Sequence, residues 1–376
     1  MIYLDSAATT MQKPPAVSRA AGYAISNMAS PGRGGHRPAM LAASTAFSCR
    51  QAAAELFGVS DPGQVILTFN ATHGLNVAIK SLVKPGDTVL VSGYEHNAVT
   101  RPLRGMEGVT LKVAAAPLFQ PEQIYRKFED LLTAEVSVVV CNHTSNVFGY
   151  ILPVERIAAL CRARGVPLIL DASQSAGTTP IRMEELGAAF IAMPGHKGLY
   201  GPQGTGLLLC APGVEAKPLL EGGTGGHSEK LTMPEFLPDR LEAGTHNITG
   251  IAGLLEGLRF VKAKGEGAIM RHEQALMAQA VQGLRRIPGV RVYAAEDRAQ
   301  QGGVLSFTVK DMDCESVGLA LGDMGIAVRC GLHCAPMAHQ TVGTLETGTV
   351  RASFSAFNTP GEVAQMICAM DRIARA

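Results

Sequence analysis

The sequence has a formal net charge of only +1 and no long apolar run, and no secretory signal is apparent in it. Its 33 Lys and Arg residues balance 32 Asp and Glu residues, so no strong field is expected to attract nucleic acid or an anionic membrane. The longest apolar runs, such as 136–141 and 166–170, are far shorter than the roughly 20 residues of a membrane span. The N-terminus shows no basic region followed by an apolar stretch and a cleavage site. These absences predict a soluble, cytoplasmic protein with a small-molecule partner.

Eight cysteines are present, but they are spread too widely to form the disulfide framework of a small secreted scaffold. In a reducing compartment they remain thiols, and most are expected to be small core residues. There is no internal repeat or low-complexity stretch. At 376 residues, 47% of them hydrophobic, the chain is long enough for one large domain with its own core and a smaller second one.

Short apolar runs alternate with helical segments between residues 65 and 209, a pattern typical of an α/β domain. Continuous apolar strands need cover on both faces, as in an open, mainly parallel sheet. One intervening helix is predicted at 153–164. The predicted strands are 65–69, 88–91, 136–141, 167–171 and 206–210.

A smaller α+β domain is predicted after a helical segment at 253–263. Its strands are expected at 290–293 and 303–309, and the start of the chain is assigned to it as well. The predicted division is a large domain at 15–255 and a small domain made of 1–14 and 256–376.

Polar residues directly follow several of the predicted strands. Because ligands bind beyond the carboxyl ends of parallel strands, these residues are expected to meet in one crevice. The segments are 70–74, 94–96, 142–146 and 171–174.

Lys197 lies in a glycine-rich turn that leads into the strand at 206–210. A desolvated amine loses its proton more easily and can form a Schiff base with an aldehyde cofactor, whereas the alternative is a solvated loop lysine. Asp171 ends a strand at the same edge of the sheet. A carboxylate there suits the protonated ring nitrogen of pyridoxal phosphate, and the alternative is a helix N-cap.

Residues 70–76 join a strand to a helix through small and hydroxyl side chains, so their backbone N–H groups could hold a phosphate. Helix capping is the alternative. Arg351 stands in an otherwise uncharged apolar strand. Its planar guanidinium could bind a substrate carboxylate, or it could pair with an internal Asp or Glu.

A glycine-containing loop at 328–336 carries two thiols and an imidazole. One interpretation is a metal site made of Cys330, His333, Cys334 and His339. A second is a nucleophilic thiol, whose thiolate fraction a nearby cation or base would increase. A buried, inert thiol is the third.

Together and in this order, these segments resemble the class V aminotransferase family of fold type I pyridoxal-phosphate enzymes. Within that family they are most similar to the type II cysteine desulfurases. The resemblance covers nearly the whole chain and implies a mainly parallel seven-stranded sheet in the large domain. The segments that carry it are 3–10, 95–98, 145–146, 171–174, 195–197, 242–245, 329–335 and 351–353.

The resemblance implies a role for each of these residues. Lys197 would carry pyridoxal 5'-phosphate, Asp171 would contact the pyridine nitrogen, and His96 would stack over the ring. Gln174 would lie near the phenolic oxygen, and Thr245 would reach the phosphate of the neighbouring subunit's cofactor in a homodimer. The remaining expected contacts are Thr72, His73 and His196 with the cofactor, Asn146 with cofactor and substrate, and Arg351 and Ala8 with the substrate.

The implied reaction converts L-cysteine to L-alanine, with the sulfur leaving as a persulfide on Cys334. The compact loop around Cys334 is similar to the type II pattern, which implies a dedicated sulfur acceptor protein. The sulfur would feed iron–sulfur cluster assembly, thiolated tRNA or another product. No metal is expected. The alternatives are a selenocysteine lyase, a class V transaminase that needs no nucleophilic cysteine, and a metal-binding or regulatory scaffold without turnover.

Three positions depart from the family pattern. Pro194 stands where many relatives have a hydroxyl residue that contacts the phosphate, and proline offers no donor. Leu332 stands where type II relatives often have a second histidine. Cys330 is an additional thiol, and a small space-filling residue is the preferred interpretation over a resolving or metal-binding one.

Overall fold

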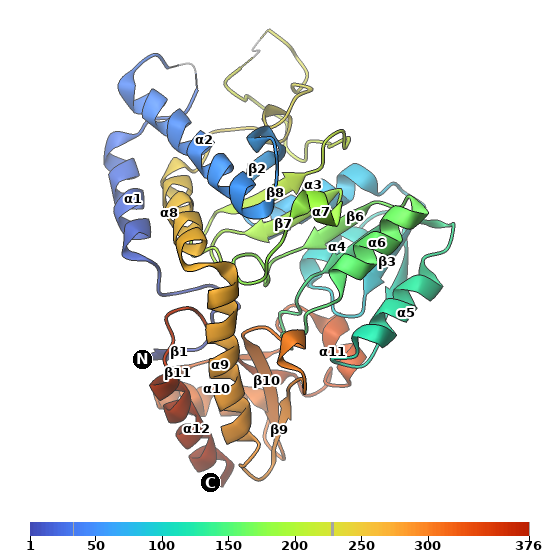
Figure 1. The fold of residues 1–376 in the computed structure, drawn as a ribbon, viewed down its shortest axis with the longest axis vertical. Helices are drawn as coiled ribbons and strands as arrows, with labels where there is room; N and C mark the ends of the chain where they lie inside the picture. The colour runs from blue at the N-terminus through green and yellow to red at the C-terminus, as the bar shows by residue number, and fades with distance from the viewer. Residues whose placement is uncertain (33, 227–228, 376) are drawn as a thin grey trace.

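The computed structural model describes residues 1–32, 34–226 and 229–375 and has a seven-stranded sheet at its centre (Figure 1). The strand order is β2-β8-β7-β6-β5-β3-β4; β8 is antiparallel to both of its neighbours, and the other adjacent pairs of this sheet are parallel. This confirms the predicted α/β class and mainly parallel sheet. The strands are β2 (Val65–Thr68), β3 (Thr88–Ser92), β4 (Thr110–Ala114), β5 (Val136–Asn142), β6 (Leu168–Asp171), β7 (Phe190–Pro194) and β8 (Gly206–Cys210).

Both faces of this sheet are covered, which explains the continuous apolar runs of its strands. Successive side chains of a strand point to opposite faces. In β5, Val138 and Val140 lie in one apolar cluster, whereas Val139 and Cys141 lie in another. All four side chains are at most 1% exposed. A strand that is buried on both sides therefore carries no polar alternation.

Helices form the two outer layers. α3 (Ala71–Leu82) and α4 (Asn97–Arg104) bury their apolar side chains on one face of the sheet. The other face is covered by α2 (Arg37–Phe57), α5 (Pro121–Leu131), α6 (Val154–Arg164), α7 (Met183–Leu186) and α8 (Ile248–Lys264). α1 (Pro15–Asn27) packs against α8 at the side of this layer.

A second core forms around a four-stranded antiparallel sheet with the order β12-β13-β10-β9. The start of the chain joins this part, because β1 (Ile2–Tyr3) pairs with β11 (Ile326–Ala327) and Leu4 lies in the second core. The other strands are β9 (Val290–Tyr293), β10 (Val304–Val309), β12 (Arg329–Gly331) and β13 (Thr349–Ser353). The helices are α9 (Glu266–Leu284), α10 (Cys314–Asp323) and α12 (Pro360–Arg375). α11 (Pro336–Val342) instead buries Ala338 in the first core.

α8 and α9 connect the two parts and are separated by Gly265 alone (Figure 1). Gly265 has a φ of +83°, a conformation that glycine adopts without the steric cost of a Cβ. Leu258 and Val261 of α8 still pack in the first core. The division at residue 255 stays a prediction, and we propose that the break in packing falls at Gly265.

The predicted strands and the helix at 153–164 coincide with observed elements to within one or two residues, whereas α8 begins five residues before the predicted segment at 253–263. The strands β1, β4, β7, β11 and β12 were not predicted. In the part of the chain that the structure describes, three short 3-10 turns lie at Pro62–Gln64, Asp239–Leu241 and Arg298–Gln300. Within the described ranges, no helix combines the length and the apolar character that a membrane crossing requires.

Candidate active site

One pocket lies where the carboxyl ends of five large-sheet strands meet. Residues that follow β2, β3, β5, β6 and β7 all contribute, as the strand-end pattern predicts. Asp171 is the one carboxylate among the lining residues. The lining residues are Asn70, Ala71, Thr72, His96, Ala98, Asn142, Thr144, Asn146, Asp171, Ser173, Gln174, Pro194, His196 and Lys197.

Lys197 follows β7 on a short turn of the chain. Burial of its amine lowers the pKa of Lys197 to about 8, although the negative charge of Asp171 acts in the opposite direction. Relative to an ordinary lysine, this shift raises the neutral fraction at pH 7 roughly 300-fold. The amine is therefore a far better nucleophile and base than the solvated loop lysine of the alternative interpretation.

The N-terminal segment holds the backbone of this turn. The carbonyl oxygen of His196 accepts hydrogen bonds from the Thr10 N–H at 3.0 Å and from the Thr9 hydroxyl at 3.2 Å. The amine of Lys13 donates to the Thr10 carbonyl oxygen at 2.7 Å and lies 3.4 Å from the same His196 oxygen. Two segments that lie far apart in the sequence thus position Lys197 together.

Asp171 is 4% exposed and ends β6. Its Oδ1 accepts the Ser173 N–H at 2.9 Å, and no helix follows, so the N-cap interpretation is wrong. Oδ2 accepts no hydrogen bond from the described residues, and Asp171 belongs to the pocket lining. A buried carboxylate with one free oxygen is suited to a cationic N–H group of a ligand.

His96 and Gln174 line the pocket on either side of Asp171 in the chain order. The Nδ1 atom of His96 accepts the Ala98 N–H at 3.0 Å and so caps α4. Burial lowers the pKa of His96, which favours the neutral ring. Gln174 donates from Nε2 to the Ala7 carbonyl oxygen at 2.9 Å. Both side chains are therefore held in place without a ligand.

The N-terminus of α3 also faces the pocket. Asn70 caps this 12-residue helix by accepting the His73 N–H at 2.9 Å, so the capping interpretation is correct. Asn70, Ala71 and Thr72 nevertheless line the pocket, where helix N–H groups favour an anion. The ring of His73 stacks on Phe69 at 4.8 Å, and His73 is absent from the lining.

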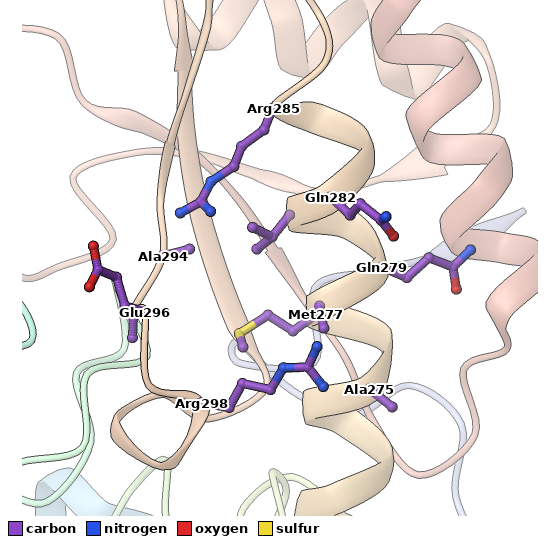
Figure 2. A pocket seen from close by; sticks show the side chains of 11 residues that line it. Ala275, Met277, Gln279, Gln282, Arg285, Ala294, Glu296 and Arg298 are labelled. Atoms are coloured by element: carbon purple, nitrogen blue, oxygen red, sulfur yellow. The ribbon is translucent and has the colours of Figure 1, made fainter.

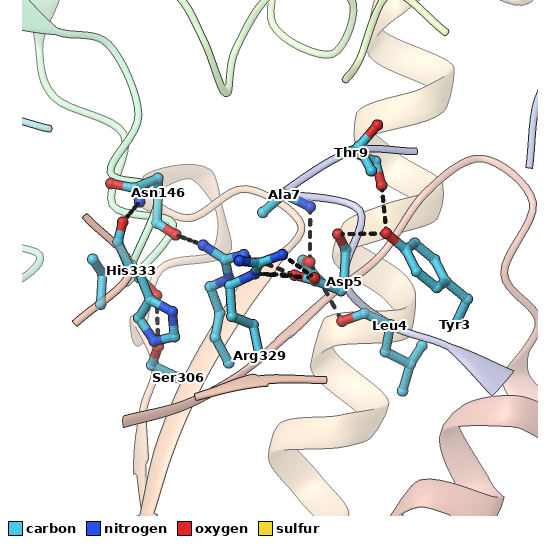
Figure 3. A network of polar contacts seen from close by, with 12 residues as sticks. Tyr3, Leu4, Asp5, Ala7, Thr9, Asn146, Ser306, Arg329 and His333 are labelled. Atoms are coloured by element: carbon cyan, nitrogen blue, oxygen red, sulfur yellow. Dashed lines mark hydrogen bonds and ion pairs between the residues drawn. The ribbon is translucent and has the colours of Figure 1, made fainter. Parts of the chain in front are cut away.

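Arg351 is 2% exposed, and the internal acidic partner that the sequence left open is Asp5, which Figure 3 shows beside Arg329. Its guanidinium donates to Asp5 Oδ1 at 2.8 Å and to the Asn146 carbonyl oxygen at 2.9 Å. Arg329 donates to the other oxygen of Asp5 at 3.0 Å. Asp5 thus lies between two arginines, and a substrate carboxylate at Arg351 would share or replace this pair.

Cys334 lies on the tight turn between β12 and α11. His333 and Cys334 have φ angles of +50° and +56°, a left-handed conformation that is costly for residues with a side chain. Two hydrogen bonds hold the turn beside the pocket: Asn97 N–H to the Cys334 carbonyl oxygen at 2.8 Å, and Asn146 Nδ2 to the His333 carbonyl oxygen at 2.7 Å. The thiol itself is exposed and is absent from the pocket lining.

The metal-site alternative does not form. In the described part of the chain, no group of three or more His, Cys, Asp or Glu side chains is placed to hold a metal ion. His333 directs Nε2 to the Thr349 hydroxyl at 3.1 Å. Cys330 is partly buried against Gly318, and burial raises the pKa of its thiol to about 12. Cys330 therefore behaves as a space-filling side chain.

Ala8 and Thr245 also lie outside the pocket lining. The Ala8 N–H donates to the Asp5 carbonyl oxygen at 3.0 Å. Thr245 borders a separate surface hollow of about 550 Å³ together with Phe47 of α2.

Asp5 was not predicted from the sequence as the partner of Arg351, because these two residues are 346 positions apart.

A larger hollow of about 650 Å³ lies elsewhere, between α9 and residues 294–298 (Figure 2). Met277, Arg285 and Arg298 line it, together with uncharged residues and Glu296. It contains no thiol and no histidine. The pocket beside Lys197 is therefore the better candidate for chemistry.

The fold and this pocket are those of a lysine-centred α/β enzyme, and the comparisons agree. The chain belongs to the aminotransferase class-V family, whose model matches residues 2–366. It is 34% identical over its full length to a probable cysteine desulfurase 1 from Mycobacterium leprae, but it spans only 62% of that protein. It is 32% identical to a probable cysteine desulfurase from Methanothermobacter thermautotrophicus, covering 96% of this chain and 92% of the relative.

Solved structures give the same answer. The apo structure of cysteine desulfurase from Thermococcus onnurineus NA1 matches with a TM-score of 0.92 at 29% identity, covering 100% of this chain and 94% of that one. The cysteine desulfurase CsdA from Escherichia coli matches with a TM-score of 0.89 at 27% identity, covering 99% and 94%. The predicted fold and family are confirmed.

Proposed function

We propose that this protein is a pyridoxal-phosphate-dependent cysteine desulfurase that converts L-cysteine to L-alanine and collects the sulfur on Cys334. The observation that supports this proposal best is a hydrogen bond between the pocket and the turn that carries Cys334. A pocket contains Lys197, Asp171 and His96, and the turn that carries Cys334 is hydrogen-bonded to Asn146 of that pocket. The named relatives and solved structures support the same reaction.

The pocket fits pyridoxal 5'-phosphate. Lys197 has the lowered amine pKa that Schiff-base formation needs, and Asp171 has a free oxygen for the ring nitrogen. The N-terminus of α3 with Thr72 suits the phosphate, and the buried Nδ1 of His196 has no partner among the described residues. Pro194 lines the pocket without offering a donor, so the phosphate would depend on α3 and His196.

The chemistry divides between cofactor and chain. When bound, pyridoxal phosphate supplies an electron sink beside the α-carbon of the substrate. Lys197 can take the α-proton near neutral pH and return it, since its pKa is about 8. The Cys334 thiolate would form a bond to the substrate sulfur as the Cβ–S bond of the substrate breaks, which leaves a persulfide and, after protonation, alanine. Arg351 and Asn146 would orient the substrate.

We further propose a homodimer with shared active sites, in which Thr245 serves the neighbouring subunit. Glu242 holds the Thr245 segment in place by accepting from Arg50 at 2.6 Å. Met40 and Phe47 lie seven residues apart on α2 and are 62% and 58% exposed. Exposed apolar side chains on one helix face beside Thr245 favour a protein interface.

The exposed position of Cys334 is suited to passing sulfur to an acceptor protein, and iron–sulfur cluster assembly is one use of that sulfur. All eight cysteines are free thiols, which favours the reducing cytoplasm as the place of action.

The decisive experiment is mass spectrometry of the Cys334 peptide after addition of L-cysteine. We expect one added sulfur on Cys334 and release of alanine. In Cys334→Ala, sulfide output should be lost while the Lys197–cofactor absorbance band remains, and Cys330→Ala in the preceding strand β12 is the matched control. A transaminase would tolerate Cys334→Ala, a scaffold would show no cofactor band, and unchanged sulfide output in Cys334→Ala would overturn the proposal.

A further inference from the structure

Glu95 is a buried acid that the proposed reaction does not use. It directly precedes His96 and lies between the carboxyl ends of β3 and β5, and it is 0% exposed. No salt bridge to Glu95 exists among the described residues. Its Oε2 atom is buried without a hydrogen-bond partner in the same part of the chain. An ionised carboxylate in such a place would be strongly destabilised.

The hydrogen atoms around Ser92 can be counted. Its Oγ atom contacts Glu95 Oε1, lies 3.0 Å from Asn142 Oδ1 and accepts the Tyr94 N–H at 3.2 Å. The amide of Asn142 has a defined orientation, because its Nδ2 donates to the Tyr94 carbonyl oxygen at 3.0 Å. Asn142 Oδ1 must therefore face Ser92, and it can only accept.

An ionised Glu95 would leave this cluster one proton short. Ser92 has a single hydroxyl hydrogen, and both Glu95 Oε1 and Asn142 Oδ1 would require it. One of these two buried contacts of Ser92 Oγ would then bring two oxygen atoms together with no hydrogen atom between them. If Glu95 is protonated, its O–H donates to Ser92 Oγ and the Ser92 O–H donates to Asn142 Oδ1. Ser92 then makes one donated and two accepted hydrogen bonds, which is its full capacity.

We propose that Glu95 is a neutral carboxylic acid at neutral pH and that its proton joins the ends of β3 and β5 beneath the pocket. The Asn142 backbone N–H also donates to Glu95 Oε1 at 2.9 Å, and Asn142 is the strand partner of Asp171. Glu95 is thus a positioning residue that acts on the pocket through Asn142. A neutral Glu95 adds no second negative charge near Asp171, which is the one carboxylate of the described pocket lining.

The groups around Glu95 agree with this assignment. Burial raises the pKa of Glu95 to about 8, opposed by the hydrogen bonds from Ser92 and Asn142 and assisted by the charge of Asp171. The other titratable neighbours are Cys141 on β5, whose pKa is also raised by burial, and the adjacent His96, whose pKa is lowered. None of these three groups supplies a positive charge that would ionise Glu95.

Infrared spectroscopy of the cofactor-free protein tests the charge state directly. At pH 7 the wild type should show the C=O stretching band of protonated carboxyl groups. In Glu95→Gln this band should lose the intensity that one carboxyl group contributes. Glu273→Gln is the matched control, because burial also raises the pKa of Glu273 to about 8 and it makes no contact in the Ser92 cluster. An unchanged band in Glu95→Gln would overturn the proposal.

Ser92→Ala provides a second route if Glu95→Gln does not fold. Loss of the Ser92 oxygen removes the acceptor of the Glu95 proton, so the band should shift to higher frequency with its intensity retained. A band that neither shifts nor weakens in Ser92→Ala contradicts the proposal.

The positioning role of Glu95 toward the cofactor rests on the proposed function, whereas the charge state of Glu95 does not. The positioning role and the charge state can therefore fail separately. In the holoenzyme, Glu95→Gln should leave the pH titration of the Lys197–cofactor band unshifted below pH 8, whereas removal of a true negative charge would shift it.

Discussion

Asp5 and Arg351 form a buried ion pair, with the Arg351 guanidinium donating to Asp5 Oδ1 at 2.8 Å. The two residues belong to opposite ends of the chain. Arg351 is 2% exposed and Asp5 is 8% exposed, so each neutralises the other away from water. The pair also connects the N-terminal segment to β13, which carries Arg351.

Removing the acidic partner should destabilise the protein. Asp5→Ala leaves Arg351 buried without an anion, and the free energy of unfolding should fall by about 3 to 5 kcal/mol, the usual cost of breaking a buried pair. Arg329→Ala is the control, because the Arg329 side chain is 50% exposed and its loss should cost about 1 kcal/mol or less. Urea denaturation measures both, and equal losses would contradict the difference in burial.

Arg351→Lys should separate charge from geometry. Lysine keeps a positive charge near Asp5 but cannot donate to Asp5 and to the Asn146 carbonyl oxygen in the planar arrangement of a guanidinium. We expect kcat/KM for L-cysteine to fall on the order of 100-fold, about 2.7 kcal/mol, while the cofactor absorbance band stays. A kcat/KM within twofold of the wild type would show that Arg351 serves Asp5 alone.

The sequence predicted what depends on local pattern. β5 and β6 were found because their apolar runs are continuous, and the strand ends that follow them pointed to the pocket. β4 was missed because it is an edge strand that carries Lys112 and has a single neighbour, β3. The Asp5–Arg351 pair depends on tertiary folding, and so does the proton shared by Ser92 and Glu95. No spacing in the sequence encodes either one.

Cofactor uptake should depend on pH through Lys197. Schiff-base formation needs the neutral amine, and burial lowers the pKa of Lys197 to about 8. The rate at which the cofactor-free protein gains its absorbance band should therefore rise with pH up to about 8 and level off above it. Stopped-flow absorbance from pH 6 to 10 measures this, with Lys197→Ala as the blank. A rate that keeps rising to pH 10 would show an ordinary, solvated lysine.

The neutral state of Glu95 should also appear in the pH dependence of stability. Its pKa is about 8 in the folded protein and is raised from 4.5, so the folded state holds a proton that the unfolded chain releases. The stabilisation is complete below about pH 4.5 and is lost as pH rises to about 8. Within that window this one group contributes a fall of about 1.4 kcal/mol per pH unit in the free energy of unfolding.

Glu95→Gln cannot take up this proton, so its free energy of unfolding should fall less steeply with pH than that of the wild type between pH 5 and 8. Urea denaturation at half-unit pH steps gives the two slopes, and their difference counts the protons bound on folding. Glu273→Gln should remove a similar slope of its own, and the double variant should add the two effects, because Glu95 and Glu273 share no hydrogen-bond partner. Parallel curves for wild type and Glu95→Gln would mean that Glu95 is ionised in the folded state, and the hydrogen bonds of Ser92 would then have to be reassigned.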